Sequence, residues 1–421
     1  MANLFAAQFP QNVNTTLIYD TFKEYYRPFT DKDFAGGLGG VDSFGRQRVS
    51  NPEMIFNSKQ LFDNQPLYWN DIEETGSGTS STYSSNAAST ILAVSASTAG
   101  KRTRQTYMRF NYQPSKSQLI YITGVLKKSG GGSGIITRMG LFDDDNGIFL
   151  QRSGSTISLV VRSNVSATPS DSNSATQANW NLDKMDGTGL SGVTLDFSKS
   201  QILVIDFEWL GVGCVRVGFV VDGNIFYCHQ FNHANNFSGV YMSTPNLPLR
   251  YQIENTGSGV ASSIECICGA VLSEGGKEDI GTNLYISTGT SPVSLTKGQL
   301  NAFLGWRLKS NYKACTIDLL DTSVYVSSID AYEWRLIMNP TVAGTFSFSD
   351  VSGSPLQRAI GNGTTNIASG GTVIAGGYGT SKLSADTNAL KALLKLGSSI
   401  NGTMDILVLC VYPLGNNALD G

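Results

Sequence analysis

Apolar and polar positions alternate through the middle of the chain. The alternation begins near Thr103 and continues through TYMRFNY, QLIYITGVL, IITRMGLF, GIFLQRS and TISLVVRS, with turn-forming stretches between the runs. Further runs follow: ILVIDFEWL, CVRVGFVV, NIFYCHQF, LRYQIENT and SSIECICGAVL. A period of two residues is typical of half-buried strands. The pattern therefore predicts about ten strands over residues 100–273, which is a β-sandwich of jelly-roll size.

The segments on either side follow other patterns. Residues 1–60 contain aromatics and glycine pairs without a sustained period, which predicts an extended arm. GSGTSSTYSSNAAST, within residues 75–99, has low complexity and predicts a loop. After the charged linker SEGGKEDIGTN, alternation resumes in KACTIDLLDTSVYVSS, YEWRLIMNP, GTFSFSD and MDILVLCVYPL. DTNALKALLKLG, in which Leu390, Leu393 and Leu394 share a face and Gly397 follows, predicts one short helix.

Together these segments predict an all-β protein with three parts. The parts are an extended N-terminal arm (1–60), a jelly-roll β-sandwich domain (61–275) and a second β-sandwich domain with one short helix (276–421). A chain of 421 residues is too long for one ordinary domain, which agrees with this division.

The composition narrows the class of protein. Only 15% of residues are charged and 46 are glycine, so hydroxyls and amides must cover much of the surface. This is typical of extracellular β-proteins and of virion proteins. The net charge of −3 gives no electrostatic basis for binding nucleic acid. No apolar run approaches the ~20 residues of a membrane span. MANLFAAQFPQNVN lacks the features of a signal peptide, so we expect synthesis in the cytoplasm without export.

The cysteines predict free thiols. Asp222-Gly223 between two alternating runs is a strong hairpin signal. If Val221 pairs with Asn224, Cys214 faces Phe231 and Cys228 faces Val217, so those thiols are out of register. Cys266 and Cys268 lie two apart on a strand, at ~6.6 Å, which suits a disulfide poorly. Buried free thiols indicate folding in a reducing compartment.

Two motifs suggest metal binding, and the sequence argues against both. His229 lies within the strand pattern IFYCHQF, and four residues along a strand span ~13 Å, so His229 and His233 are too far apart to share a metal. We expect a packed or hydrogen-bonded strand histidine at 229 and a loop histidine at 233. With no third histidine, a catalytic triad is also disfavoured. DDDNG, residues 143–147, fails the calcium-loop pattern because Phe142 and Ser153 occupy ligand positions. A turn between strands is favoured there, and incidental surface calcium stays open. We expect no cofactor and no metal.

The basic stretch KRTRQTYMR (101–109) also fails as a site for nucleic acid. Its basic residues do not gather on one face of a strand, because successive side chains alternate between faces.

Asp206 and Glu208 are the most chemically suggestive pair. On a strand they share a face ~6.6 Å apart, and paired carboxylates can cleave glycosidic bonds. VIDFEWLG also resembles the EIDIEFLG signature of laminarinase-type glycoside hydrolases. That resemblance makes Asp206 the assisting residue and Glu208 the acid, but Val204 stands where the nucleophile should be. The alternative is a half-buried sheet face whose carboxylates meet nearby Arg or Lys, or point to solvent or a glycan.

A longer resemblance covers residues 44–276. SFGRQRVSNPEMIFNSKQLFDNQPLYW, RQTYMRFNYQPSKSQLIYITG, WNLDKMDGTG, EWLGVGCVRVGFVVDG, HANN, YMSTPNLPLRYQIENTG and SEGG occur in this order. WRLIMNPTVAGTFSFSD and TVIAGGYGT continue it more loosely. The set resembles structural proteins of tailed-bacteriophage virions, which are tail, fibre or head-decoration components.

This resemblance implies a virion protein without catalytic residues, made in the bacterial host cytoplasm. Its partners would be capsid, portal or tail proteins, and it would form a homo-oligomer, with a trimer as the first expectation. Contact with a host-surface glycan is a further expectation. Two other functions stay open: a lectin-like carbohydrate-binding module, and a glycan hydrolase using Glu208.

The arm is the expected assembly anchor. Six of its aromatics lie close together among glycines and cannot be buried by local structure: Phe22, Tyr25, Tyr26, Phe29, Phe34 and Phe44. Exposed apolar patches of that size are unusual in monomers, whereas aromatics are common anchors at interfaces. We therefore expect docking onto a neighbouring protein. The alternative is that the arm wraps around the chain's own first sandwich.

Overall fold

The fold was analysed in a computed structural model of the chain. It describes residues 42, 43, 46, 48, 51–278, 281–290, 293–317, 319, 322–324, 331–380 and 395–414. These residues form strands and two 3-10 helices, η2 (Gln177–Asn179) and η3 (Ser310–Tyr312), and no α-helix. The predicted all-β fold class is therefore confirmed. The predicted helix falls mainly on residues 386–394, outside the described residues.

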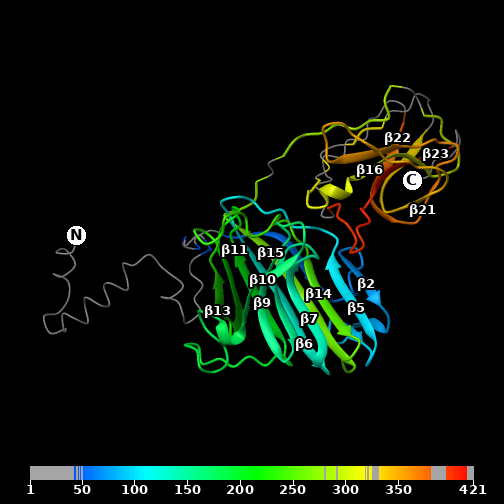
Figure 1. The fold of residues 1–421 in the computed structure, drawn as a ribbon. Coiled ribbons are helices and arrows are strands. Elements are labelled where there is room, and N and C mark those ends of the chain that lie inside the picture. The colour runs from blue at the N-terminus through cyan, green and yellow to red at the C-terminus, as the bar shows by residue number, and fades with distance from the viewer. Residues whose placement is uncertain are drawn as a thin grey trace, which may run out of the picture.

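Two antiparallel sheets face each other in the first part of the chain (Figure 1). The eight-stranded sheet has the order β13 (Asn224–Phe231), β12 (Val215–Val221), β11 (Gln201–Phe207), β6 (Ser117–Ser129), β15 (Ser262–Glu274), β4 (Ser89–Val94) and β3 (Thr79–Ser84), with β1 (Glu53–Lys59) also paired to β15. The seven-stranded sheet has the order β10 (Ser170–Thr176), β9 (Thr156–Ser163), β8 (Gly147–Gly154), β7 (Gly132–Phe142), β14 (Leu249–Thr256), β5 (Ala99–Thr106) and β2 (Trp69–Gly76).

The core of the sandwich lies between the two sheets. Alternate residues of each strand point inward, as the period of two requires. On β11 these are Leu203, Ile205 and Phe207, all fully buried, and they pack in one cluster with Leu150 of β8 and Ile253 of β14. The residues between them therefore point to the outer face of the eight-stranded sheet.

Two segments that the sequence assigned to the arm and to a loop are strands. Residues 53–59, within the predicted arm, form β1 and pair with residues 268–273 of β15. Residues 79–84 and 89–94, within the predicted loop, form the hairpin β3–β4, and β4 pairs with β15. Both predictions were wrong there because short polar segments gain their order from pairing with a distant strand, which local periodicity does not report.

The predicted hairpin at Asp222-Gly223 is confirmed. Both residues have positive φ, 51° and 80°, as a tight two-residue turn requires. Val221 pairs with Asn224, but the register shifts after Gly218, so that Val217 faces His229 and Val215 faces Phe231. The predicted pairing of Cys228 with Val217 was therefore wrong by one residue, because a β-bulge was not anticipated. All six cysteines are free, as predicted.

The second group of strands forms a six-stranded antiparallel sheet beyond one end of the sandwich (Figure 1). Its order is β19 (Ser349–Asp350), β20 (Leu356–Ile360), β16 (Asn301–Leu308), β23 (Leu407–Pro413), β17 (Tyr332–Met338) and β22 (Thr372–Gly379). A two-stranded ribbon joins β18 (Thr341–Val342) to β21 (Ala368–Ser369). The domain boundary near residue 275 stays a prediction, although β15 ends at Glu274 and β16 begins at Asn301.

Polar contacts join the two groups of strands. Lys313 Nζ lies 2.9 Å from Asp145 Oδ2, and Asn246 donates to the carbonyl oxygen of Ala314 at 2.9 Å. The backbone N–H of Ile400 donates to Asn70 Oδ1 at 2.8 Å. These contacts place the loop after η3 and the loop before β23 against the sandwich.

Candidate functional site

Asp206 lies on the outer face of the eight-stranded sheet. On β11 it stands between Arg216 of β12 and Leu119 of β6 in the sheet register. It is nevertheless fully buried. Burial of a carboxylate is unfavourable unless the charge is paired and hydrogen-bonded, so its partners explain why it is tolerated.

Five groups satisfy the two oxygens of Asp206. Arg216 Nη2 lies 2.6 Å and Arg48 Nη2 2.5 Å from Oδ2, which also accepts a hydrogen bond from the Tyr227 hydroxyl at 2.8 Å. The hydroxyls of Ser117 and Ser43 donate to Oδ1 at 2.7 and 2.6 Å.

Arg48 extends this network to Glu274 of β15, with its Nε 2.6 Å from Glu274 Oε1. The Arg216 guanidinium also stacks over the Tyr227 ring at 4.7 Å. We call Asp206, Arg216, Arg48, Tyr227 and Glu274 the Asp206 cluster. Its two cations and two carboxylates balance, and they come from three strands and the segment before β1.

The cluster stabilises the ionised form of Asp206. Burial alone would raise the pKa of this carboxyl, but Arg216 and Arg48, together with the hydroxyls of Ser117 and Ser43, outweigh burial and lower it to about 2. Glu274 behaves in the opposite way: burial and the neighbouring Asp206 charge raise its pKa, although Arg48 partly offsets them. Asp206 is thus a fixed negative charge that organises cations around it.

The predicted glycan-facing pair is not present. Asp206 is sealed in the cluster and cannot contact a glycan, so that part of the prediction was wrong. Glu208 lies after the end of β11, is half-buried, and accepts a hydrogen bond from the backbone N–H of Cys214 at 3.1 Å. Burial raises the pKa of Glu208. Val204, at the position of a hydrolase nucleophile, is fully buried and packs with Leu119 and Leu272. The alternative that the carboxylate meets arginines is confirmed for Asp206.

The segment before β1 is held on this face by four residues, which we call the N-terminal contact residues: Asp42, Ser43, Arg46 and Arg48. Asp42 accepts from the backbone N–H and the Nε of Arg46 at 2.9 and 2.8 Å, and Arg46 Nη1 donates to the carbonyl oxygen of Ser115. Ser43 and Arg48 bind Asp206. The six predicted anchor aromatics lie outside the described residues, so the anchor stays a prediction. Ser43, Arg46 and Arg48, within the predicted arm, contact the chain's own sandwich.

Sequence reasoning missed the cluster. Ser43 and Arg48 are separated from Asp206 by 163 and 158 residues, and no local pattern connects them. Arg216 did carry a signal, since a charged residue inside the apolar run CVRVGFVV needs a partner on a neighbouring strand.

The acidic turn at residues 143–146 joins β7 to β8, as predicted. Each of its carboxylates is paired with a cation: Asp143 with Arg109 at 2.6 Å, Asp144 with Arg250 at 2.6 Å, and Asp145 with Lys313 at 2.9 Å. Among the described residues no group of three or more His, Cys, Asp or Glu could hold a metal ion. The carboxylates of the turn are therefore used in ion pairs within the fold.

Both histidines are packed, as predicted. His229 Nδ1 accepts a hydrogen bond from the backbone N–H of Asn181 at 3.2 Å, and its ring lies edge-on to Phe231. Burial lowers its pKa to about 4. His233 stacks on Tyr241 at 4.0 Å and its Nδ1 lies 2.6 Å from the carbonyl oxygen of Gly213. Burial also lowers its pKa, although that hydrogen bond opposes the shift. Both rings therefore serve packing.

The basic stretch 101–109 is also used within the fold. Lys101 pairs with Glu74 at 2.6 Å and Arg102 with Asp71 at 2.7 Å. Arg104 is fully buried over the ring of Trp69, at 5.0 Å. In the part of the chain that the structure describes, no helix is long and apolar enough to span a membrane.

Comparison with known proteins gives neighbours of similar shape only. No family model and no curated protein matches the chain. The CBM2 module of the evolved Dit protein of Lactobacillus casei BL23 phage J-1 is 9% identical, covering 54% of this chain and 98% of its own, with a TM-score of 0.35. The legume lectin-like domain from Entamoeba histolytica is 10% identical (53% and 98% covered, TM-score 0.31). An endo-1,3-β-glucanase from Streptomyces sioyaensis is 11% identical (54% and 98% covered, TM-score 0.33). Similarities this low carry no argument about function.

Proposed function

We propose that the protein is a structural component of a tailed-bacteriophage virion, as a fibre, tail or capsid-decoration protein, and that it works by assembly rather than catalysis. The supporting observation is where the virion-protein resemblance falls in the fold. Four of the resembling segments supply residues of this network. Ser43, Arg48, Ser117 and Arg216 contact Asp206, and Glu274 contacts Arg48. The resemblance therefore coincides with the network that fastens the N-terminal contact residues to the sandwich.

This network suits an assembly role. Its charges hold Ser43 and Arg48 against the sandwich instead of lining a cleft. The aromatics of the arm would then act as the anchor on capsid, portal or tail proteins, and a homo-oligomer, with a trimer first, would present several arms together. A sandwich distal to the arm would face the host surface.

The test is incorporation into particles. Purified virions should contain the chain in stoichiometric copies by mass spectrometry, and cryo-electron microscopy should place it and count its neighbours. Deletion of residues 1–40, which leaves the N-terminal contact residues in place, should abolish incorporation while the free protein keeps its circular dichroism and its Tm. Incorporation of the truncated chain at the full copy number would show that the arm is not the anchor.

A lectin-like role is the second candidate, favoured by the outer face of the seven-stranded sheet. Arg138 donates to Gln151 and Gln252 at 2.7 and 2.6 Å, and Gln252 donates to Thr103 at 3.1 Å, so amides and a guanidinium cross several strands. Gln252 and Thr103 are buried, so the groups available to bind sugar hydroxyls are the partly exposed Arg138 and Gln151. Binding of the isolated chain to a glycan array, lost on Arg138→Ala, would support this function over a purely structural one.

A further inference from the structure

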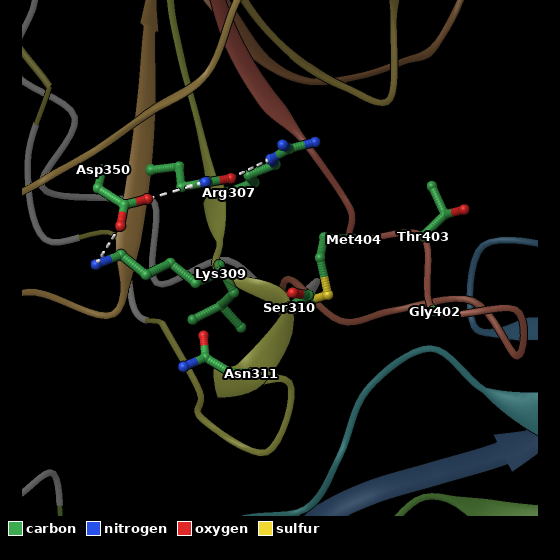
Figure 2. Close-up of a pocket in the computed structure, with 10 residues that line it drawn as sticks. Arg307, Lys309, Ser310, Asn311, Asp350, Gly402, Thr403 and Met404 are labelled. Carbon is green, nitrogen blue, oxygen red and sulfur yellow. Dashed lines mark hydrogen bonds and ion pairs between the residues drawn. The ribbon is translucent and has the colours of Figure 1, made fainter.

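A pocket opens beside the six-stranded sheet. It has a volume of about 510 Å³ and lies between the end of β16 with η3 on one side and the loop before β23 on the other. Figure 2 shows Asp350, Lys309 and Asn311 on one side, with Met404, Thr403 and Gly402 opposite. Ligand pockets typically have about 300–1,000 Å³, so this one has room for a small oligosaccharide.

A row of polar groups forms one wall of the pocket (Figure 2). Arg307 Nε donates to Gln357 Oε1 at 2.8 Å, Gln357 Nε2 donates to Asp350 Oδ1 at 3.0 Å, and Lys309 Nζ lies 3.2 Å from Asp350 Oδ2. The Arg307 guanidinium also stacks over the ring of Phe348 at 4.4 Å. The row therefore holds Arg307 in one orientation before any ligand arrives.

This wall keeps unused donors. Among the described residues, the two Nη atoms of Arg307 have no hydrogen-bond partner. The same holds there for the Ser310 hydroxyl and the Asn311 amide. Two cations face one carboxylate, so the wall is both rich in donors and positive. Such a set favours a ligand with several oxygen acceptors and a negative charge, and the planar guanidinium suits a carboxylate.

The rest of the pocket favours a sugar as the carrier of that carboxylate. Met404 gives the pocket a small apolar contact beside the polar wall, with 8% of its surface exposed, whereas Leu308 is almost fully buried behind it. Thr403 lies exposed opposite. A pyranose ring presents C–H groups on its faces and hydroxyls at its edge, so it can contact both kinds of surface. A free phosphate would use the cations alone.

We propose that this pocket binds an acidic oligosaccharide, with the carboxylate of a uronic acid unit on Arg307 and Lys309 and its hydroxyls on Asn311 and Gln357. This inference is independent of the virion role, since it concerns a ligand of the isolated chain. Asp350 acts as a positioning residue, because it orients Lys309 and Gln357.

The experiment is calorimetric titration of the full chain with trigalacturonate, with its neutral methyl ester and with inorganic phosphate. We expect trigalacturonate to bind at least ~10-fold more tightly than the ester, because the ester removes the charge that Arg307 and Lys309 recognise. Arg307→Lys keeps the positive charge but removes the planar guanidinium with its paired N–H donors, and should weaken binding by about 5- to 10-fold. Asn311→Ala, at an exposed position, should weaken it by about 3-fold.

Lys297→Met is the matched control, because it removes an exposed lysine outside the pocket, and it should leave binding unchanged. Each variant is checked for an unchanged Tm. The proposal is overturned if trigalacturonate does not bind, if the ester binds equally well, or if phosphate alone displaces trigalacturonate at equal concentration. Equal losses in Lys297→Met and Arg307→Lys would also overturn it, since binding would then not depend on the residues of the pocket.

Discussion

The Asp206 cluster and the Arg307 pocket contain the same kinds of side chain in opposite states. Each has two cations beside a central carboxylate on the edge or face of a sheet, and the Asp206 cluster contains Glu274 as a second carboxylate. In the first, Asp206 is fully buried and both of its carboxylate oxygens accept hydrogen bonds. In the second, the side chain of Asp350 is 63% exposed and the Arg307 guanidinium keeps free donors.

The difference follows from what covers each site. Ser43 and Arg48 lie over Asp206 and complete its hydrogen bonds, so charge there contributes to folding. Nothing comparable covers Arg307 among the described residues. Desolvated ion pairs are strongly coupled, whereas exposed ones are screened by water. Residue type alone therefore does not separate a structural ion pair from a binding surface.

The largest expected effect is from Asp206→Ala. It leaves Arg216 and Arg48 buried without their common carboxylate, so the free energy of unfolding should fall by about 3–5 kcal/mol. Asp350→Ala, which removes an exposed carboxylate with the same kind of partner, should change it by less than ~1 kcal/mol. Urea denaturation of both variants against the wild type measures the contrast.

Equal effects of the two substitutions would remove the distinction between the sites. If Asp206→Ala does not fold, limited proteolysis of Arg48→Ala gives a second measure. Loss of this link should increase cleavage before β1 without unfolding the sandwich.

Acid should lower the stability of the folded sandwich in two stages. The pKa of His229 is about 4, below the ordinary value near 6.5, so the unfolded chain takes up this proton first and stability falls as pH drops from about 6.5 to 4. Asp206 has its pKa lowered to about 2, so its contribution is complete above about pH 4 and is lost between pH 4 and 2. The second stage should amount to about 2 kcal/mol.

Urea denaturation at a series of pH values from 7 to 2 checks this dependence. Glu208 and Glu274 have the opposite effect, because their raised pKa values make the folded state more stable as they take up protons. They therefore reduce the fall in the free energy of unfolding near pH 4–5. His229→Gln should flatten the first stage and leave the second. Constant stability between pH 4 and 2 would contradict the low pKa of Asp206.

The smallest effect is expected at the contact between the two groups of strands. Lys313 and Asp145 are both partly exposed, at 40% and 36% of their side chains. Lys313→Ala should therefore cost less than ~1 kcal/mol, and this difference should disappear in high salt. Scanning calorimetry at low and high ionic strength measures it, with Lys297→Ala as the exposed control. A fall of more than 2 kcal/mol in the free energy of unfolding would show that this pair behaves like the buried ion pairs of the Asp206 cluster.

The sequence by itself determined the strands with clear local signals. Alternation in CVRVGFVV and NIFYCHQF, with Asp222-Gly223 between them, specified β12, β13 and their turn, because side-chain period and turn geometry are local properties. The acidic turn at 143–146 was also evident, since it separates two alternating runs.

Only the tertiary structure decided the rest. The bulge at Cys228, the pairing of β1 and β4 with β15, and the burial of Asp206 depend on partners far away in the sequence. The pair Asp206 and Glu208 shows the reason most clearly. Strand periodicity places Asp206 on an outer face, which suggests exposure, but Ser43 and Arg48 cover it from a segment without any pattern of its own. Whether a sheet face meets solvent is a property of what packs on it, and a local sequence pattern does not contain that information.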